Sequence, residues 1–180
     1  TAIPGLSVAS FLRTAVNARR RPIDAGDGEI DPSDLTRNAM TMGDFRKLMR
    51  EKMALLKLDD RFAARYVNDG FSGGEKKRME ILQLLMLKPR FAIFDETDSG
   101  LDVDALKVVA AGINRMRGPG FSALLITHYR RLLDLVKPDR VHIMERGRIA
   151  ASGSFELVEL LERDGYEGVR RLSEEAVHAV

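Results

Sequence analysis

The sequence predicts an α/β fold in which an α-helical subdomain precedes a half built on a parallel sheet. Up to residue 89, apolar residues recur at intervals of three and four, as they do on amphipathic helices. Beyond residue 90, the apolar runs Phe91–Phe94 and Ala123–Thr127 flank a helical pattern, as in a βαβ unit. We therefore expect a helical subdomain over 1–89, an α/β core over 90–168 and a C-terminal tail over 169–180.

Length and composition indicate a globular domain. The 180 residues are 44% apolar and 31% charged, and no run approaches the roughly 18 apolar residues of a membrane span. We therefore expect no direct membrane insertion. The 29 Lys and Arg residues nearly balance the 27 Asp and Glu residues, so we expect no nucleic-acid partner. Because the chain has no Cys, it has no disulfide and no thiolate ligand for a metal cluster.

The first half is predicted to be entirely helical, because apolar stripes at helical spacing follow residues that favour N-caps. One segment rich in Gly, Asp and Pro interrupts the pattern and predicts an exposed loop. The expected elements are a helix capped by Ser7 that runs to about Arg20, a loop over Pro22–Asp34, a helix from about Met42 to Leu56, a short helix over Asp59–Val67, a turn over Asn68–Gly70, and a helix from Ser72 to about Leu87, before Pro89.

The second half alternates strands and helices. Continuous apolar runs predict strands that are buried on both faces of a parallel sheet, and the crossover is long enough to be right-handed. The expected elements are a strand over Phe91–Phe94, a helix capped by Asp102 and ended by Gly118–Gly120, a strand over Ala123–Thr127, a short helix to about Lys137, strands over Arg140–Met144 and Arg148–Ala151, a helix over Phe155–Arg163, and a tail that frays after Gly168.

The stretch from Gly70 to Arg78 predicts a helix start that can bind an anion. Ser72 is a good N-cap, and Glu75 three residues later completes a capping box. Gly73 and Gly74 lack side chains, so a ligand can reach the backbone N–H groups at the positive end of the helix dipole. A capping box with glycines is by itself mostly a structural signal. The ligand that best suits such a surface is phosphate.

Three further segments follow in order: Phe91–Glu96 with its two terminal carboxylates, Ser99–Asp102, and Leu124–His128. Together with the glycine stretch they resemble the signature motif, Walker B motif, D-loop and switch histidine of the ABC ATPases. The resemblance implies a partial P-loop NTPase fold, in which the helical subdomain precedes a RecA-like half. It also implies ATP and Mg²⁺ as cofactors and a transient, ATP-dependent head-to-tail dimer.

The resemblance assigns roles to residues that the predicted sheet brings together. Asp95, Glu96 and His128 each follow a parallel strand, at the edge where open α/β sheets bind ligands. Asp95 would join the Mg²⁺ shell through water, Glu96 would be the base and His128 would sense the γ-phosphate. The structural alternatives are a solvated acidic turn and a structural histidine, as for His142 and His178. The candidate catalytic residues are Glu96 and His128, and the candidate nucleotide-binding residues are Ser72, Gly73, Gly74, Glu75, Asp95 and Asp102, which is also an N-cap.

Within the ABC ATPases, the sequence resembles the SufC family, which serves iron–sulfur cluster assembly. The segments that carry this resemblance are 70–78, 95–102 and 125–129, with Thr97 where transporter ATPases usually have Pro and Glu75 where they commonly have Gln. The resemblance implies a cytoplasmic ATPase that works with SufB- and SufD-like scaffold proteins. The Met and Phe residues on the apolar faces of the helical subdomain favour docking of such a partner there.

Two other hypotheses remain open at this point. The chain could be the nucleotide-binding subunit of an ABC transporter, whose helical subdomain would dock on a membrane permease, or a non-catalytic interaction module. The sequence departs from the family pattern because it contains no G-x-x-x-x-G-K-[ST]. It also opens at Thr1 with neither an initiator Met nor a signal peptide. We therefore expect an N-terminally truncated sequence that lacks the P-loop and Q-loop and hydrolyses no ATP alone.

Overall fold

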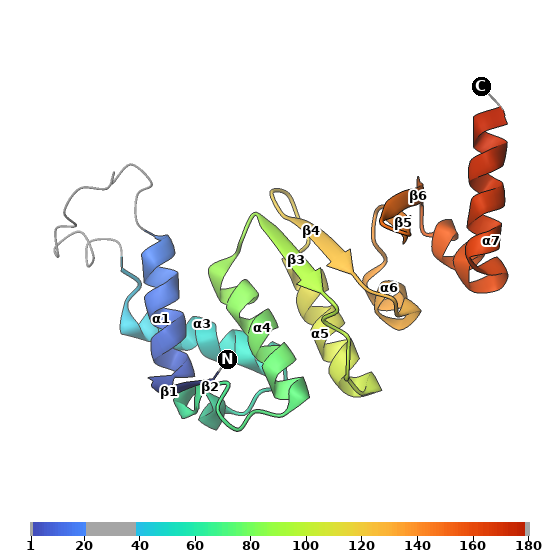
Figure 1. Ribbon diagram of the computed structural model, residues 1–180. Helices are drawn as coiled ribbons and strands as arrows, with labels where there is room; N and C mark the ends of the chain where they lie inside the picture. Colours follow the sequence, from blue (N-terminus) through green and yellow to red (C-terminus); the bar gives the residue numbers. More distant parts are fainter. Residues whose placement is uncertain (1, 21–38, 179–180) are drawn as a thin grey trace. The chain divides into compact units, whose positions relative to one another are not determined.

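The computed structural model describes residues 2–20 and 39–178 and divides the chain into two compact units, Thr1–His128 and Tyr129–Val180 (Figure 1). The predicted loop over Pro22–Asp34 lies outside the described residues. The first unit holds both the predicted helical elements and the first βαβ unit. The subdomain boundaries after residues 89 and 168 stay a prediction about the intact protein.

The helices predicted for the first half are present as α1 (Val8–Arg19), α3 (Met42–Leu55) and α4 (Gly73–Leu87). Each begins at an N-cap whose side chain accepts a hydrogen bond from a backbone N–H three residues on, which satisfies one of the donors left free at a helix start. The N-caps are Ser7, Thr41 and Ser72, and they accept from the N–H groups of Ser10, Asp44 and Glu75. Both α1 and α3 pack against α4.

The prediction of an entirely helical first half is wrong at two places. β1 (Ile3–Ser7) pairs with β2 (Tyr66–Val67) in an antiparallel ladder, and η1 (Asp60–Ala64), a short 3₁₀ helix, replaces the short helix predicted to run to Val67. Pro and Gly in β1 disfavour a helix there. Strands as short as β2 show no alternation of polar and apolar residues, and their pairing depends on a contact distant in sequence.

The predicted βαβ unit is confirmed. β3 (Phe91–Asp95) pairs in parallel with β4 (Ser122–Ile126), and α5 (Val103–Met116) forms the crossover. Asp102 caps α5, because its Oδ1 accepts a hydrogen bond of 2.7 Å from the Ala105 N–H. The parallel register brings the carboxyl ends of the two strands to the same edge, with Asp95 opposite Ile126.

The prediction that these strands are buried on both faces is wrong for the described part of the chain. Ala92 and Phe94 of β3 are buried, whereas Phe91 and Ile93 are 55% and 60% exposed. Leu124 and Ile126 of β4 are also exposed. These two strands form a two-stranded sheet, and the exposed side chains show that one face of it is uncovered in the described part of the chain.

A close approach of two helices fixes α4 against α5. A Cβ atom built at Gly112 of α5 would lie 2.4 Å from Cγ2 of Ile81 on α4, a separation that real Cβ atoms do not tolerate. Glycine is therefore required where the helices meet, although it disfavours a helix interior. Ile81 of α4 and Ile113 of α5 are both buried in the core. The packing holds the helix that carries the glycine stretch beside the helix that follows the carboxylates.

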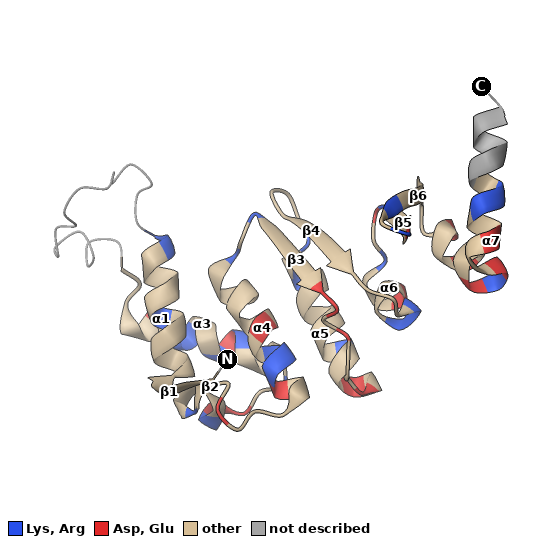
Figure 2. Cartoon of the chain, viewed as in Figure 1, with Lys and Arg blue, Asp and Glu red and all other residues tan. Residues whose placement is uncertain are grey.

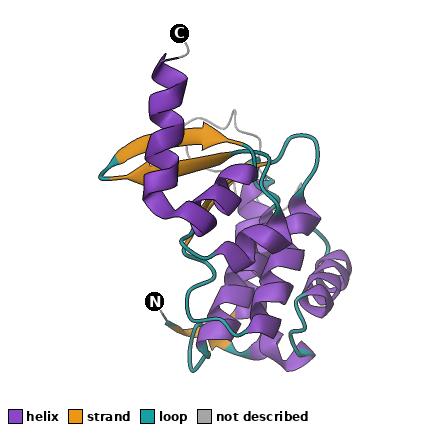
Figure 3. Ribbon diagram, turned by 90° about the vertical axis from the view of Figure 1, so that its right-hand side faces the viewer, coloured by secondary structure: helices purple, strands orange, loops and turns teal. Residues whose placement is uncertain are grey.

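The second unit contains α6 (Arg130–Val136), β5 (Val141–Glu145), β6 (Arg148–Gly153) and α7 (Glu156–His178). The predicted hairpin is confirmed, and α7 lies against it (Figure 3). The prediction that the tail frays after Gly168 is wrong. Helical structure continues to His178 beyond a non-helical Gly165, because Val169 is fully buried against Ile143 and Leu157.

Charged residues of both signs are spread over the two units (Figure 2). Acidic residues follow one another from the end of β3 into the first turn of α5, namely Asp95, Glu96, Asp98, Asp102 and Asp104. In the ranges 2–20 and 39–178, no helix is long and apolar enough to cross a membrane.

Candidate functional site

The start of α4 forms the capping box that the sequence predicts. Ser72 Oγ accepts a hydrogen bond from the Glu75 N–H at 3.2 Å, and Glu75 Oε2 accepts one from the Ser72 N–H at 2.8 Å. Two of the donors left unsatisfied at a helix start are thereby bonded reciprocally. The remaining N–H groups of the first turn point out of the helix at the positive end of its dipole.

The two glycines of this turn are not required by packing. A Cβ atom at Gly73 would meet nothing within 4 Å, and one at Gly74 would meet only Ala105 Cβ at 3.9 Å. Neither glycine has a positive φ. Since neither packing nor backbone conformation requires glycine here, its presence twice supports approach of a ligand to the backbone.

Arg65 organises the approach to this helix, and sequence analysis missed it. Its Nη1 lies 2.5 Å from Glu75 Oε1, and its Nη2 donates to the Gly70 carbonyl at 2.9 Å. Its guanidinium also stacks 4.5 Å from the centroid of the Phe71 ring. One side chain therefore ties the turn before Ser72 to the capping carboxylate. Arg65 and Glu75 are ten residues apart, beyond the reach of the local rules for helix capping. The available sequence signal for this contact is an Arg shortly before a Ser-x-x-Glu capping box.

The pKa of Glu75 is lowered from 4.5, first by the hydrogen bond from the Ser72 N–H and then by Arg65. A depressed pKa in the folded state means that Glu75 contributes stability above its unfolded pKa, and this contribution is lost as the pH falls through the folded pKa.

We expect Glu75→Gln to lower the free energy of unfolding by about 1 kcal/mol at pH 7, and by clearly less near pH 3. Urea denaturation of both proteins at the two pH values measures the difference. A gap that stays constant with pH would contradict this role of the carboxylate.

The strand ends bring Glu96 and His128 together, as the sequence predicts. His128 Nδ1 lies 3.4 Å from Glu96 Oε1, and both side chains are more than half exposed. The Glu96 N–H donates to the Ile126 carbonyl at 2.9 Å, which extends the β3–β4 ladder by one residue. Glu96 itself has a φ of 45°, a left-handed conformation that is strained for a non-glycine residue. Strain of this kind is concentrated at functional sites.

A second link joins the same two loops and was also missed from the sequence. Thr127 Oγ1 donates to Asp98 Oδ2 at 2.6 Å. Asp98 is only 6% exposed, and its neighbour Thr97 only 4%. The loop after β3 therefore turns inward at residues 97 and 98, whereas the side chains of Asp95 and Glu96 face outward.

The carboxylates suit Mg²⁺ as a partner of a bound nucleotide. Asp95 ends β3 with an exposed side chain, and Glu96 follows it. In the described ranges, no group of three or more His, Cys, Asp or Glu side chains could hold a metal ion. Mg²⁺ binds proteins through one or two carboxylates and keeps waters or substrate phosphates as its other ligands. Asp95 would hold such an ion through water, and the ion would supply positive charge to the phosphates.

The predicted site residues thus form two clusters. The signature cluster consists of Ser72, Gly73, Gly74 and Glu75 at the start of α4, and the strand-end cluster consists of Asp95, Glu96 and His128. Asp102 caps α5 at a position after Glu96 in sequence, and its polar contact is with the helix it starts. The signature cluster offers N–H donors, and the strand-end cluster offers carboxylates and an imidazole. Donors for phosphate and a base for water are complementary parts of a phosphoryl-transfer site.

Comparison with known proteins identifies relatives over most of the chain. The sequence pattern of the ABC transporter family matches residues 9–99. A protein of Streptococcus pyogenes described as "Probable ABC transporter ATP-binding protein" is 52% identical over 93% of this chain and 60% of its own length. "Probable ATP-dependent transporter SufC" of Escherichia coli is 49% identical over 91% of this chain and 61% of its own length. The chain therefore spans about 60% of the length of these curated relatives.

Solved structures show the same fold. The ATP-binding cassette MJ0796, in a dimeric structure, matches with a TM-score of 0.63 over 86% of this chain and 59% of its own, at 19% identity. An ATP-binding subunit of an ABC transporter matches with a TM-score of 0.64 over 99% of this chain and 63% of its own, at 20% identity. The α/β fold predicted from the sequence is confirmed as that of the ABC ATPases.

Proposed function

The chain belongs to the ABC transporter family of ATP-binding proteins, and on this basis we propose that its full-length gene product is a cytoplasmic ATPase that drives iron–sulfur cluster assembly on SufB- and SufD-like scaffold proteins. The observation that carries the ATPase assignment is the Glu96–His128 pair at the carboxyl ends of two parallel strands. In this proposal Asp95 joins the Mg²⁺ shell, Glu96 orients the attacking water as a base and His128 contacts the γ-phosphate.

The signature cluster acts in trans. In a head-to-tail dimer, Ser72 and Gly74 of one subunit contact the γ-phosphate of the nucleotide held by the strand-end cluster of the other. The open space at Gly73 and Gly74 supports this arrangement, because the phosphate can approach the N–H groups without displacing a side chain. Arg65 neutralises Glu75, so the capping carboxylate does not repel the incoming phosphate.

The choice of iron–sulfur assembly over membrane transport rests on the segment after β3. Transporter ATPases usually have Pro at the position of Thr97, whereas this chain has Thr97-Asp98, both buried. Identity of 49% to SufC of Escherichia coli supports the same choice. The 52% identity to the streptococcal ATP-binding protein keeps transport as the second candidate function.

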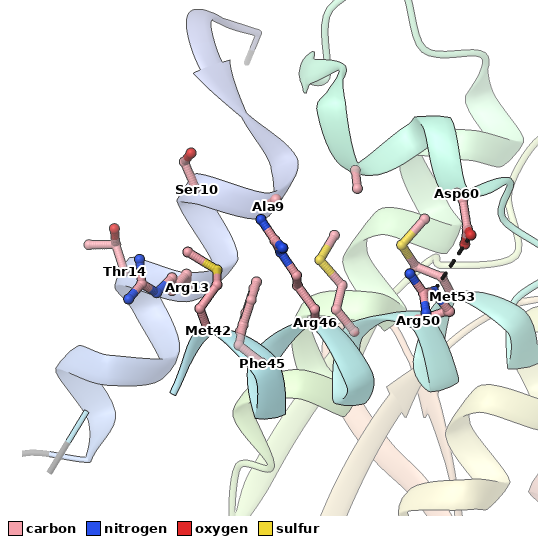
Figure 4. A pocket seen from close by; sticks show the side chains of 12 residues that line it. Ala9, Ser10, Arg13, Thr14, Met42, Phe45, Arg46, Arg50, Met53 and Asp60 are labelled. Carbon is pink, nitrogen blue, oxygen red and sulfur yellow. Dashed lines mark ion pairs between the residues drawn. The ribbon is translucent and has the colours of Figure 1, made fainter. Parts of the chain in front are cut away.

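A groove on the helical elements supports docking of a partner. It lies between α1 and α3, beside η1, and has a volume of about 510 Å³ (Figure 4). Its floor contains Phe45, Met49 and Met53, which are buried, and Met42 at its edge is 41% exposed. Methionine side chains adapt to partner shapes, and a helix can bury an apolar stripe in a groove of this kind.

The charge of the groove favours an acidic partner helix. Arg13, Arg46 and Arg50 line it against a single carboxylate, that of Asp60. Arg50 pairs with Asp60 at 3.6 Å, whereas Arg46 has no ion pair with a described residue, and Arg13 Nε is buried without a hydrogen bond in the described part of the chain. An amphipathic helix with carboxylates beside its apolar stripe would pair with the exposed guanidinium group of Arg46.

Affinity capture of the full-length gene product from cell extract tests the proposed partner. We expect soluble cluster-assembly scaffold proteins to be recovered with the wild type, and recovery to fall at least tenfold with Arg46→Glu, because reversal of this charge repels an acidic helix. Lys47→Glu is the matched control. It makes the same change of charge one residue on but does not line the groove, so it should retain the partner.

Two outcomes would contradict the proposal. Recovery of a polytopic permease in place of soluble scaffold proteins, in extract that contains membranes, would establish the transporter alternative. Equal loss of the scaffold with Arg46→Glu and Lys47→Glu would remove the groove from the interface.

The 180-residue chain alone is expected to show no ATP turnover, because it contains no G-x-x-x-x-G-K-[ST] to cradle the phosphates.

A further inference from the structure

We propose that Asp98 and Thr127 form a buried latch that positions Glu96 and His128 for hydrolysis, an inference that rests on the proposed ATPase function. Asp98 lies two residues after Glu96, and Thr127 immediately precedes His128. The bond between Thr127 Oγ1 and Asp98 Oδ2, at 2.6 Å, has the length of a charge-assisted hydrogen bond. The latch therefore ties the loop that carries the base to the loop that carries the imidazole.

Burial makes this bond costly to lose. Asp98 is 94% buried by area, and its Oδ1 accepts no hydrogen bond from the described residues. Among the described residues, the Thr127 hydroxyl is therefore the side-chain donor that offsets the cost of burying the Asp98 carboxylate. An ionised carboxylate left buried without a donor is strongly unfavourable, so the two loops are held at the separation that the bond requires.

The contact between the two neighbouring catalytic side chains is exposed and long. The Glu96 and His128 side chains are 55% and 59% exposed, and their 3.4 Å contact is long for a hydrogen bond. Exposed ion pairs of this kind contribute little to the positions of their side chains. The hydrogen bond from the Glu96 N–H to the Ile126 carbonyl fixes the end of β3. The loop after Glu96 is held by the hydrogen bond between the buried Asp98 and Thr127. We infer that the latch, rather than the exposed pair, sets the distance between base and sensor.

The latch makes Asp98 and Thr127 positioning residues, since Asp98 is buried, Thr127 is half-buried and their side chains bond to each other. Loss of such an outer partner typically lowers activity by about 10- to 100-fold. Because the interaction acts on the geometry of the hydrolytic step, kcat should fall while KM for ATP stays within about twofold.

Thr127→Val and Thr127→Ser test the latch in the full-length gene product. Valine keeps the shape of threonine without its hydroxyl, so we expect kcat for ATP to fall about 10- to 100-fold with KM unchanged. Serine keeps the hydroxyl and loses only a methyl group, so it should retain at least half of the wild-type kcat. Thermal denaturation of each variant without nucleotide shows whether it is folded at the assay temperature. Asp98→Asn, which weakens the bond but leaves no buried charge, is the second variant and should lie between the two.

Each outcome decides the inference. Unchanged kcat in a folded Thr127→Val variant would overturn the latch, as would equal losses in the Val and Ser variants. A rise in KM without a fall in kcat would assign the bond to nucleotide binding and also overturn it. If Thr127→Val does not fold, the kcat of Asp98→Asn decides, and a wild-type value there overturns the inference. Absence of turnover in the wild-type gene product would instead be a failure of the proposed function, so the two are distinguishable.

Discussion

Glu96→Gln in the full-length gene product is expected to lower ATP turnover by about 10²- to 10⁴-fold, the range for loss of a general base. The amide has the size of the carboxylate but cannot accept a proton from the attacking water. Glu96 lies at the end of β3 beside His128, and its backbone is held by Ile126, so the substitution should leave the fold unchanged. Nucleotide affinity, measured by titration with ATP in the absence of turnover, should stay within a few-fold of the wild type.

Asp104→Asn provides the matched control for this loss. Asp104 is an exposed carboxylate in the first turn of α5, eight residues from Glu96, and its ion pair is with Lys107 on the same helix. The control should retain wild-type turnover, because exposed pairs of this kind contribute little. An equal loss of activity in both variants, or a parallel loss of ATP affinity with Glu96→Gln, would remove Glu96 from the role of base.

Gly74→Asp is expected to abolish ATP-dependent dimerisation, with little effect on ATP binding by the monomer. The new carboxylate would stand in the first turn of α4, where the γ-phosphate of the opposing subunit approaches, and two anions would be brought into contact. The fold should tolerate the change, because a Cβ atom at Gly74 would meet only Ala105 Cβ at 3.9 Å. Size-exclusion chromatography with and without ATP, on the Glu96→Gln background that retains nucleotide, measures the effect.

Gly74→Ala separates charge from bulk. Its Cβ atom fits the same open space and carries no charge, so dimerisation should be weakened less than with Asp. If Gly74→Asp instead lowered the ATP affinity of the isolated monomer as strongly as it lowered dimerisation, the glycine would serve its own subunit's nucleotide and the trans arrangement would be wrong.

Local signals explain what could be predicted from the sequence. The caps at Ser7, Ser72 and Asp102 act over three residues, and each is present as predicted. The juxtaposition of Glu96 and His128 followed from strand order alone, since parallel strands bring their carboxyl ends to one edge. These features depend on pattern and topology, which a single sequence displays.

The features that sequence analysis missed depend on contacts between distant residues. The pairing of β1 with β2 joins residues about sixty apart, and Arg65 reaches Glu75 across a turn. The burial of Asp98 could not be predicted, because an Asp in an acidic segment is ordinarily solvated and only the fold brings Thr127 to it. The exposed face of β3 was mispredicted for the related reason that an apolar run does not specify how many layers cover it.

Mixing two inactive variants tests most directly the claim that the signature cluster of one subunit completes the strand-end cluster of the other. Glu96→Gln and Gly74→Asp are purified separately, combined in equal amounts and assayed for ATP turnover. A mixed dimer contains one doubly damaged site and one intact site. At the doubly damaged site the new Asp still opposes the γ-phosphate, so mixed dimers form less readily than the half expected of a random mixture. Turnover should therefore return above that of either variant alone but stay below about a quarter of the wild-type value. A mixture as inactive as its components, and as a protein that carries both substitutions in one chain, would contradict the account.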